Sequence, residues 1–600
     1  MQYYLDWVDQ IAIFAIYAMS LNLLMGYAGQ LSVAHAAFGA VGGYTAGYLS
    51  AHEGFGFAGA LACGIAAAGL VGMLVSLPAL RLSREYLVLL TLATATIITS
   101  VATSVDIFGG ALGLQGIQAP SLFGKQFLRP ADFTATFVVL MVVVLAICWR
   151  LGESPFGRVL RGIRDDETVA RSLGKNVFAY KIVVFGITSG MAGLAGALMA
   201  FYNQLAIPGQ YGFTTTMSII AMVIVGGIGN LWGAVVGVVL VVVLQPILEK
   251  VVHLPADKAS LVRLIVYGGI VVGTLVVRPQ GLIPERLRGS RAKRRTRAEL
   301  LGLSAPAARP VAIAELPPPE RHAPAAEVAV RVTLAPRLPA SGDELARGAP
   351  ILTVEGLSKS FGGIYAARDL SFGLRQGSIT GLIGPNGAGK TTVFNLLTGA
   401  IRPESGSIRL HGKDITGWTP NRIAREGMVR SFQDVRVYPR ISALENVAIG
   451  VPRQPGERAS ELFLFPHRVW RGARRTREKA FECLEFVGLA GQAHFAAGEL
   501  SFGDQKLIAL ARILATDANV LLLDEPASGI DSRSVDRLLE TIESIRAHGK
   551  TVCVVEHNLQ VVERIAETIY FMESGSIVAS GTMQELVAQP RLADVYFGMA

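Results

Sequence analysis

The sequence predicts two regions of different fold class: an N-terminal all-α region with about nine membrane spans, followed by a C-terminal α/β domain built around a phosphate-binding loop. Three observations predict this division. Apolar runs broken by short polar loops continue to Val277. Residues 384–391 read GPNGAGKT. Residues 520–526 read VLLLDEP, a buried strand ending in two carboxylates.

The composition also indicates a membrane protein. Only 17% of the 600 residues are charged, whereas about a quarter is usual in soluble domains. The four cysteines lie far apart and form no CxxC pair, so neither a disulfide framework nor a zinc site is expected. The N-terminal residues MQYYLDWVDQ lack a basic region, which argues against a cleaved signal peptide.

A helix needs roughly 20 apolar residues to cross the hydrocarbon core. The predicted spans lie near 8–25, 31–50, 57–79, 86–105, 134–150, 181–202, 214–228, 231–248 and 261–277. The seventh is short, and glycines interrupt the chain at 226–230. As an alternative, the first two spans form one helix that is broken around GYAGQ. Basic residues crowd the loop 149–180, which the positive-inside rule places in the cytoplasm. The N-terminus then lies outside, and nine spans leave the C-terminal domain cytoplasmic.

The polar loop 153–175 is predicted to be helical after Pro155. With an ATPase downstream, we interpret it as a coupling helix that docks on that domain; an ordinary solvated basic loop is the alternative. Its candidate coupling residues are Asp166, Glu167, Ala170, Leu173 and Gly174.

Polar residues within the first two spans are a separate question, because polar groups are costly at membrane depth and often mark a transport path. These residues are Asn22, Gln30, Ser32 and His35. Structural hydrogen bonding is the alternative role for each of them.

We place the domains at 1–285 (transmembrane), 286–350 (linker) and 351–600 (nucleotide-binding). The linker is first basic and then rich in Ala and Pro. Beside a membrane span, such a basic cluster attracts anionic lipid, so nucleic-acid binding is not expected. The remainder is predicted to be a tether that keeps the two domains at high effective concentration.

The loop at 384–391 lies between a predicted strand and a predicted helix, as a P-loop requires. Its glycines permit the tight turn, and its backbone N–H groups face the phosphates of ATP. Lys390 is expected to contact the β- and γ-phosphates, and the Thr391 hydroxyl to ligate Mg²⁺. The predicted ATP-binding residues are Gly384, Pro385, Asn386, Gly387, Ala388, Gly389, Lys390, Thr391 and Thr392.

The carboxylates at the end of the VLLLDEP strand complete the predicted site. Asp524 is placed to hold Mg²⁺ and Glu525 to polarise the attacking water. Alternatively, the two carboxylates only cap a helix; the P-loop upstream argues against this interpretation.

LSFGDQ at 500–505, together with SFQDVRVYP and VVEHN, resembles the motif set of ABC transporter ATPases. The resemblance implies that the signature binds ATP held by an opposing ATPase, through Ser501, Phe502, Gly503, Asp504 and Gln505. Phe502 and Asp504 depart from the common LSGGQ form. The resemblance covers about 351–599 and is a close one to LivG-type ATPases.

The same resemblance implies further roles around the nucleotide. Gln433 would sense Mg²⁺ and the attacking water, and His557 would contact the γ-phosphate. Asp531 matches the D-loop that links two ATP sites. Phe361 stands where this family stacks an aromatic ring on adenine, although a core position is an alternative for this residue.

The membrane region has its own resemblance. LNLLMGYAGQLSVAHAAFGAVGGY, SPFGRVLRGIRDDETVARSLGKN and GGIGNLWGAVVG resemble LivM-type permeases of branched-chain amino acid ABC importers. The likeness covers nearly all of 1–285, but IFGGALGLQGI at 107–117 matches the family's glycine-rich outer loop only loosely. A binding protein could touch that loop, so the identity of the ligand is left open there.

These resemblances imply an ATP hydrolase coupled to transport: a permease fused to its ATPase in the bacterial inner membrane, using ATP and Mg²⁺. Branched-chain amino acids are the expected cargo; urea, short amides and aromatic acids are alternatives. An ABC exporter half is a further alternative. In this family each ATP is bound between the phosphate loop of one ATPase and the signature of another, so one chain cannot complete the site alone. The expected partners are therefore a second permease and a second ATPase, or a second copy of this chain. A periplasmic binding protein is the other expected partner.

Overall fold

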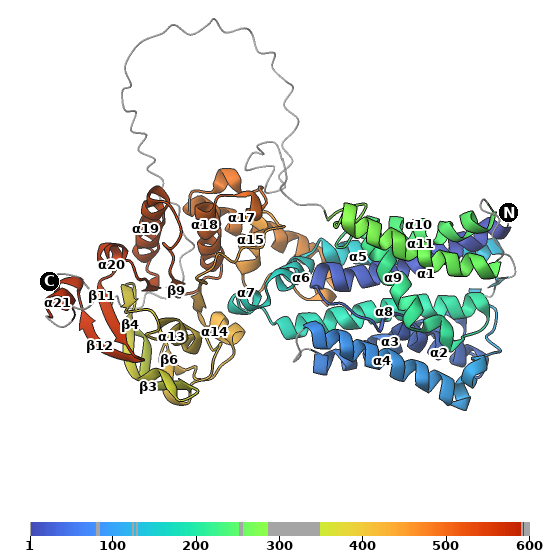
Figure 1. The fold of residues 1–600 in the computed structure, drawn as a ribbon, viewed down its shortest axis with the longest axis horizontal. Helices are drawn as coiled ribbons and strands as arrows, with labels where there is room; N and C mark the ends of the chain where they lie inside the picture. The colour runs from blue at the N-terminus through green and yellow to red at the C-terminus, as the bar shows by residue number, and fades with distance from the viewer. Residues whose placement is uncertain are drawn as a thin grey trace, which may run out of the picture. The chain divides into compact units, whose positions relative to one another are not determined.

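The computed structural model describes residues 2–79, 84–122, 125–127, 130–250, 256–285, 348–589 and 592. The chain divides into two compact units (Figure 1). Unit 1 comprises 1–171, 175–286 and 455–469, and unit 2 comprises 172–174, 287–454 and 470–600. Nearly all of the predicted linker, residues 80–83 and the C-terminal residues DVYFGMA lie outside the described residues.

Unit 1 is almost entirely α-helical, which confirms the predicted all-α permease fold. Its long helices are α1 (Gln2–Asn22), α2 (His35–Ala51), α3 (Phe57–Ala79), α4 (Arg84–Ser104), α5 (Pro130–Gly152), α8 (Val177–Asn203), α9 (Phe213–Gly226), α10 (Leu231–Lys250) and α11 (Ala256–Val277). Shorter elements are η1 (Leu23–Tyr27), η2 (Asp106–Phe108), η3 (Gly110–Leu112), β1 (Ser121–Leu122), β2 (Lys125–Gln126), α6 (Pro155–Asp165), α7 (Glu167–Ser172), η4 (Pro208–Tyr211) and α16 (Ala459–Leu464).

A helix lies at each predicted span, but fewer helices are long and apolar enough to cross a membrane by themselves. Five of the described helices meet that criterion. The stretches 208–226 and 231–244 meet it only together, and they are bent by 119° at the glycine break noted in the sequence. These two therefore form a broken span or a re-entrant pair, and the total of nine crossings remains a prediction.

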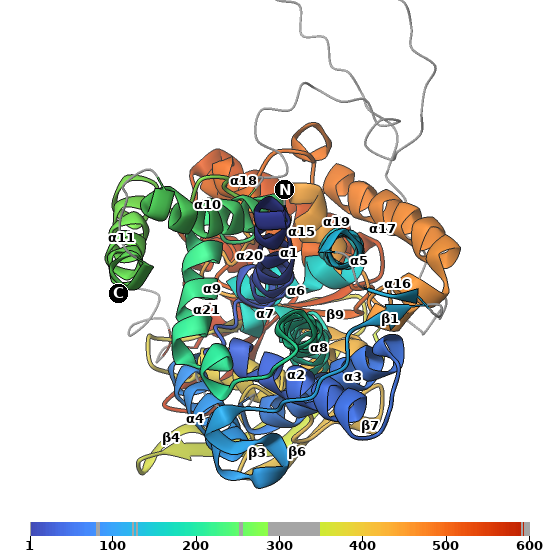
Figure 2. The same ribbon diagram turned by 90° about the vertical axis from the view of Figure 1, so that its right-hand side faces the viewer.

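Helix α8 packs against α2 and α3, and α1 packs against α5, α8 and α10 (Figure 2). Small residues make the α2–α8 contact possible. A Cβ atom added at Gly42 would lie 2.2 Å from the Gly193 carbonyl oxygen, so no larger residue fits there without moving a backbone. This close packing explains why residues 26–44, GYAGQLSVAHAAFGAVGGY, are rich in glycine and alanine.

Two of the polar residues noted in the first spans make structural hydrogen bonds. The Asn22 amide donates to the Asn230 carbonyl oxygen over 2.7 Å and accepts from the Gly229 N–H over 2.8 Å, which ties the end of α1 to the break between α9 and α10. His35 Nε2 lies 2.7 Å from Ser20 Oγ. The side-chain oxygens of Gln30 and Ser32 are buried, and the described residues offer them no hydrogen-bond partner.

Unit 2 has the α/β fold predicted for 351–600. A mostly parallel sheet has the strand order β12 (Ser576–Gly581), β11 (Thr568–Glu573), β5 (Ile379–Ile383), β10 (Thr551–Val555), β9 (Val520–Asp524) and β8 (Met428–Arg430), with β12 antiparallel to β11. An antiparallel sheet has the order β4 (Ile364–Arg375), β3 (Pro350–Phe361), β6 (Ser405–Leu410) and β7 (Lys413–Asp414). Strands β5, β9 and β10 are buried along their whole length, as parallel strands covered on both faces are.

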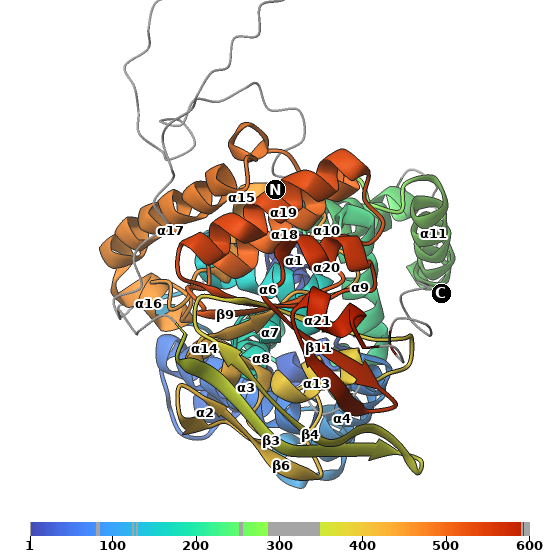
Figure 3. The ribbon, with the colours of Figure 1, turned by 90° about the vertical axis from the view of Figure 1, so that its left-hand side faces the viewer.

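The helices of unit 2 complete the fold. They are α13 (Lys390–Leu397), α14 (Pro420–Glu426), α15 (Ala443–Gly450), α17 (Pro466–Phe486), η5 (Ala490–Gln492), η6 (Ala497–Glu499), α18 (Phe502–Leu514), α19 (Ser532–Ala547), α20 (Leu559–Ile565) and α21 (Met583–Val587). In Figure 3, β3, β4 and β6 lie on one side of this unit, and α18, α19 and α20 lie on the other. Residues 455–469, which lie within the predicted nucleotide-binding domain 351–600 by sequence, group with unit 1, whereas 470–480 stay in unit 2.

Candidate nucleotide site and its coupling loop

The phosphate-binding loop joins the end of the buried strand β5 to the first turn of α13. Gly389 has a φ of 101°, and a Cβ atom there would lie 2.0 Å from the Ala366 carbonyl oxygen. Any other residue at this position would therefore both strain the backbone and collide with it. The tight loop leads directly into the N-terminus of α13, where backbone N–H groups favour a bound phosphate.

Lys390 folds back over this loop. Its ammonium donates to the carbonyl oxygens of Gly384 over 2.7 Å and Pro385 over 2.9 Å. Burial lowers the pKa of Lys390, while the carboxylates of Glu525 and Asp524 oppose that shift. Within the described part of the chain, the two carbonyl oxygens hold the ammonium of Lys390 at the loop, where phosphate oxygens could replace them.

Asp524 ends β9 and is buried. Its Oδ2 pairs with the Arg430 guanidinium from β8. Its Oδ1 is also buried and has no hydrogen-bond partner among the described residues. Burial raises the pKa of this carboxyl, and Arg430 opposes the rise.

The open Oδ1 atom suits a divalent cation, because Mg²⁺ prefers oxygen ligands and binds through one or two carboxylates plus phosphate oxygens. Among the described residues, no group of three or more His, Cys, Asp or Glu side chains forms a metal site. Phosphate oxygens of the nucleotide would complete the ligands of a Mg²⁺ ion here. Thr391 is exposed in the first turn of α13, next to Lys390 in the sequence, and would supply a hydroxyl ligand.

The structure brings three of the predicted catalytic residues together. Gln433 Nε2 donates to Glu525 Oε2 over 2.8 Å, and His557 Nδ1 lies 3.9 Å from the same oxygen. Glu525 has a φ of 45°, a conformation that favours glycine, and its N–H bonds to the Val555 carbonyl oxygen over 2.9 Å. Local backbone strain of this kind gathers at functional sites.

The signature begins helix α18. Ser501 is its N-cap: its hydroxyl accepts from the Asp504 N–H over 3.2 Å and lies 2.8 Å from Asp504 Oδ2. Gln505 donates to the Leu500 carbonyl oxygen over 2.9 Å. At Gly503 a Cβ atom would lie 2.9 Å from Ser534 Oγ, and the Phe502 side chain is half exposed. The unusual Asp504 therefore has a local structural role in capping.

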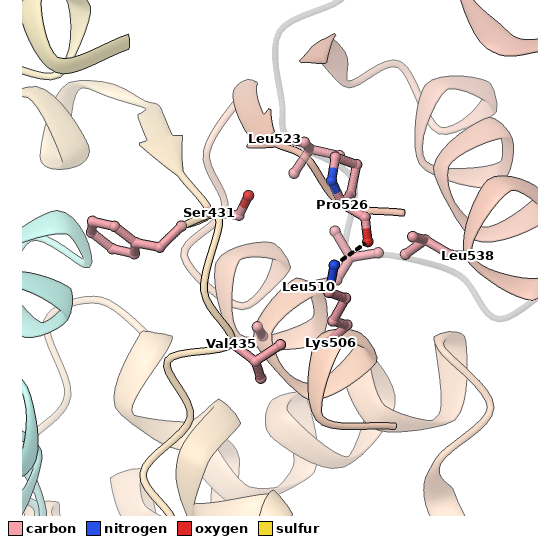
Figure 4. A pocket seen from close by; sticks show the side chains of 9 residues that line it. Ser431, Val435, Lys506, Leu510, Leu523, Pro526 and Leu538 are labelled. Atoms are coloured by element: carbon pink, nitrogen blue, oxygen red, sulfur yellow. Dashed lines mark hydrogen bonds between the residues drawn. The ribbon is translucent and has the colours of Figure 1, made fainter. Parts of the chain in front are cut away.

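Besides Arg430, sequence analysis missed two further buried residues, which hold the segment that follows β9. The Lys506 ammonium donates to the carbonyl oxygens of Glu525, Pro526 and Ser528, and so ties α18 to the segment after β9. It lines a small cavity of about 30 Å³ (Figure 4). Glu556, next to His557, accepts from the Ala527 N–H over 2.8 Å. The only sequence signal was position: Lys506 directly follows the LSFGDQ signature, and Glu556 lies in VVEHN directly before His557.

The remaining predicted residues of the nucleotide site lie in the D-loop segment, at the end of β3 and in the phosphate-binding loop. Asp531 caps α19, accepting from the Ser534 N–H over 3.1 Å, and the same segment lines a polar pocket of about 310 Å³ that also includes His557. Phe361 ends β3 with 49% of its surface exposed, which excludes the core alternative. Pro385, Asn386, Gly387 and Ala388 form the loop itself, and Thr392 follows in α13.

The candidate coupling residues divide between the units. In unit 1, Asp166 Oδ1 accepts from the Val169 N–H over 3.0 Å, Glu167 pairs with Lys181 over 2.7 Å, and Ala170 is buried. In unit 2, Leu173 is buried and the Gly174 carbonyl oxygen accepts from Arg425 Nε over 2.8 Å.

Comparisons with known proteins agree with both halves of this description. A family model described as the branched-chain amino acid transport system permease component matches residues 3–275, and an ABC transporter model matches residues 367–528. The chain is 38% identical over 253 residues to BraF, a high-affinity branched-chain amino acid transport ATP-binding protein of Pseudomonas aeruginosa. That alignment covers 42% of this chain and 99% of BraF.

The chain belongs to the ABC transporter family. It joins a permease region to an ABC ATPase that hydrolyses ATP to drive transport. LivG of Salmonella typhimurium is 36% identical over 252 residues, which are 42% of this chain and 99% of LivG. A nucleotide-free ATP-binding cassette from an ABC transporter has 31% identity and a TM-score of 0.36, covering 41% of this chain and 99% of that structure.

The Arg430–Asp524 pair gives a prediction about stability. Arg430→Met leaves a buried carboxylate without its cation, which typically costs about 3–5 kcal/mol. We expect a clear fall in the thermal unfolding midpoint of the transporter in detergent. Arg564→Met is the matched control, because it breaks the Arg564–Asp536 pair between largely exposed side chains, which is worth at most about 1 kcal/mol. Equal shifts for the two variants would contradict this account.

Glu525 gives a prediction about catalysis. Glu525→Gln preserves the shape and the contact with Gln433 but removes the base, so we expect ATP hydrolysis to fall by about 100-fold or more while bound ATP is retained. Phosphate release and retained nucleotide are measured on the purified transporter. Glu540→Gln, on the exposed surface of α19, should hydrolyse ATP at the wild-type rate. A Glu525→Gln variant with normal turnover would show that another group activates the water.

Proposed function

We propose that this transporter is half of an ATP-driven importer for branched-chain amino acids. Its permease lies at 1–285, its linker at 286–350 and its ATPase at 351–600. The observation that supports this most is the match of residues 3–275 to a branched-chain amino acid permease component in the same chain as an ATPase related to BraF and LivG. An exporter half is not favoured by that permease match.

In the proposed ATP cycle, the loop 384–391 binds the phosphates and Lys390 neutralises part of their charge. Mg²⁺ would be held by Asp524 and Thr391, with Gln433 nearby, and would offset the charge that develops on the transferred phosphoryl group. Glu525 would take a proton from the attacking water, and His557 would contact the γ-phosphate. Phe361, exposed at the end of β3, is available to stack on adenine.

The sequence holds one GPNGAGKT loop and one LSFGDQ signature. In the proposed complex, the residues Ser501 to Gln505 would bind ATP held by a second ATPase, and Asp531 would link the two sites. The partner is a second permease and ATPase or a second copy of this chain. A periplasmic binding protein would deliver the cargo at the outer face of the bacterial inner membrane, and the ATPase would be cytoplasmic.

We propose that the loop 153–175 couples the ATPase to the permease. Helix α6 makes charged contacts within unit 1: Arg164 Nη1 donates to the Gly26 carbonyl oxygen in η1 and lies 3.0 Å from Glu285 Oε2, while Arg161 Nε lies 3.8 Å from Glu285 Oε1. The guanidinium of Arg161 also lies 4.8 Å from the centre of the Tyr27 ring. A displacement of α6 would therefore pull on the end of the first span and on the residues after α11.

Substrate uptake tests the proposed cargo. The transporter and its partner subunits are reconstituted in liposomes loaded with ATP, and a periplasmic branched-chain amino acid binding protein is added outside. We expect uptake of labelled leucine that is competed by isoleucine and valine, and that is absent with Glu525→Gln. Uptake of labelled urea, acetamide or benzoate in place of leucine would contradict the assignment of cargo.

The coupling role is tested with two arginines of the same loop. Arg164→Ala removes the buried contacts with Gly26 and Glu285, so we expect uptake per ATP hydrolysed to fall by about tenfold, within the usual range of coupling between sites. Arg171→Ala removes only a pair with Glu167 on the half-exposed surface of α7 and should leave that ratio unchanged. An unchanged ratio for Arg164→Ala would reject the coupling role of α6.

A further inference from the structure

The segment 455–469 belongs to the ATPase half by sequence but packs within unit 1. Its helix α16 lies beside α5 (Figure 2). Leu462 of this helix is fully buried in the hydrophobic core of unit 1, and Ala459 and Val469 pack against the same core. The segment is thus a part of the membrane unit rather than a loop of the ATPase.

Directed hydrogen bonds fix its position. Arg150 donates to the Leu462 carbonyl oxygen from both Nε, over 3.0 Å, and Nη2, over 2.7 Å. The Phe156 N–H donates to the Gly456 carbonyl oxygen over 3.1 Å, and Lys175 pairs with Glu457 over 2.5 Å. These contacts all come from the end of α5 and from the loop that follows it.

The same contacts set the depth of the segment relative to a bilayer. Arg150 stands near the end of the apolar stretch 131–152, one of the helices able to cross a membrane. Its neighbour Trp149 is 60% exposed. Tryptophan and arginine at the end of a span are typical of the membrane–water interface, so Leu462 is held at that level.

The residues that follow Leu462 are apolar and uncovered. Phe463, Leu464 and Phe465 are 46%, 68% and 42% exposed. Burying a side chain of this size typically stabilises by about 1.5–3 kcal/mol, so leaving three in water forgoes that gain. Arg468 lies next to them, its guanidinium 4.9 Å from the centre of the Phe465 ring. Beyond it, α17 continues with the exposed residues Trp470 and Arg471.

We propose that Phe463, Leu464 and Phe465 insert into the cytoplasmic surface of the bilayer, with Arg468 at the anionic lipid headgroups. Exposed aromatic and aliphatic side chains beside arginine are the composition of segments that lie in the membrane interface. The anchoring of Leu462 at the end of α5 brings them to that interface. A stretch of ATPase sequence would thereby act as a lipid anchor of the permease.

The test is the depth of a nitroxide label at Leu464→Cys in the full-length transporter, reconstituted in nanodiscs of phosphatidylethanolamine and phosphatidylglycerol. Cys63 is replaced by alanine. Cys148, Cys483 and Cys553 are buried, and burial raises the pKa of the Cys483 and Cys553 thiols to about 12, so these thiols resist labelling. Collision rates with oxygen and with a nickel chelate report the depth of the label.

Two positions calibrate the measurement: Val139→Cys on the exposed face of α5 for lipid, and Glu540→Cys on α19 for water. We expect the label at Leu464 to collide with oxygen more than with nickel, at about 5–10 Å below the phosphates. Nickel accessibility like that at Glu540 would overturn the proposal, because the segment would then lie in water. Protection from both reagents, or dipolar broadening between labels, would overturn it in favour of a protein partner or a second copy.

Discussion

The nucleotide site depends on one buried charge. Asp524 lies at the end of a strand that is buried along its whole length, where an uncompensated carboxylate would be costly. Arg430 compensates it through one oxygen and leaves the other open. Because β8 and β9 are neighbours in the parallel sheet, the pairing of these strands places the two side chains together. The open oxygen, the phosphate loop after β5 and Glu525 then surround the space in which ATP and Mg²⁺ would react.

Buried polar contacts also determine the arrangement of the helices in unit 1. Membrane-spanning helices have little hydrophobic reason to prefer one arrangement, so close packing and buried hydrogen bonds fix it. Asn22 ties the first span to the break after α9, and Arg164 ties α6 to both η1 and Glu285. The end of unit 1 that holds α6 is thus joined through side chains that a moving α6 would carry along.

The sequence predicted much of this because local rules decide it. The glycines of GPNGAGKT predict the loop between a strand and a helix, and the apolar run VLLL predicts the buried strand before Asp524. Arg430 and Lys506 could not be predicted, since their partners lie 94 and 19 residues away and only strand order and helix docking bring them together. For the bend of 119° between α9 and α10, the sequence showed only the glycines at 226–230 and not the angle. The packing of 455–469 within unit 1 depended on tertiary contacts that composition does not encode.

The most direct test of this account is whether the open oxygen of Asp524 receives the metal. Mn²⁺ binding in the presence of ADP is measured by electron paramagnetic resonance on the full transporter, with Asp536→Asn as the control for loss of an exposed carboxylate. We predict that Asp524→Asn weakens Mn²⁺ binding by about 10-fold or more, as the loss of a metal-site group does, and that Asp536→Asn leaves it unchanged. Equal affinity in wild type and Asp524→Asn would contradict the account.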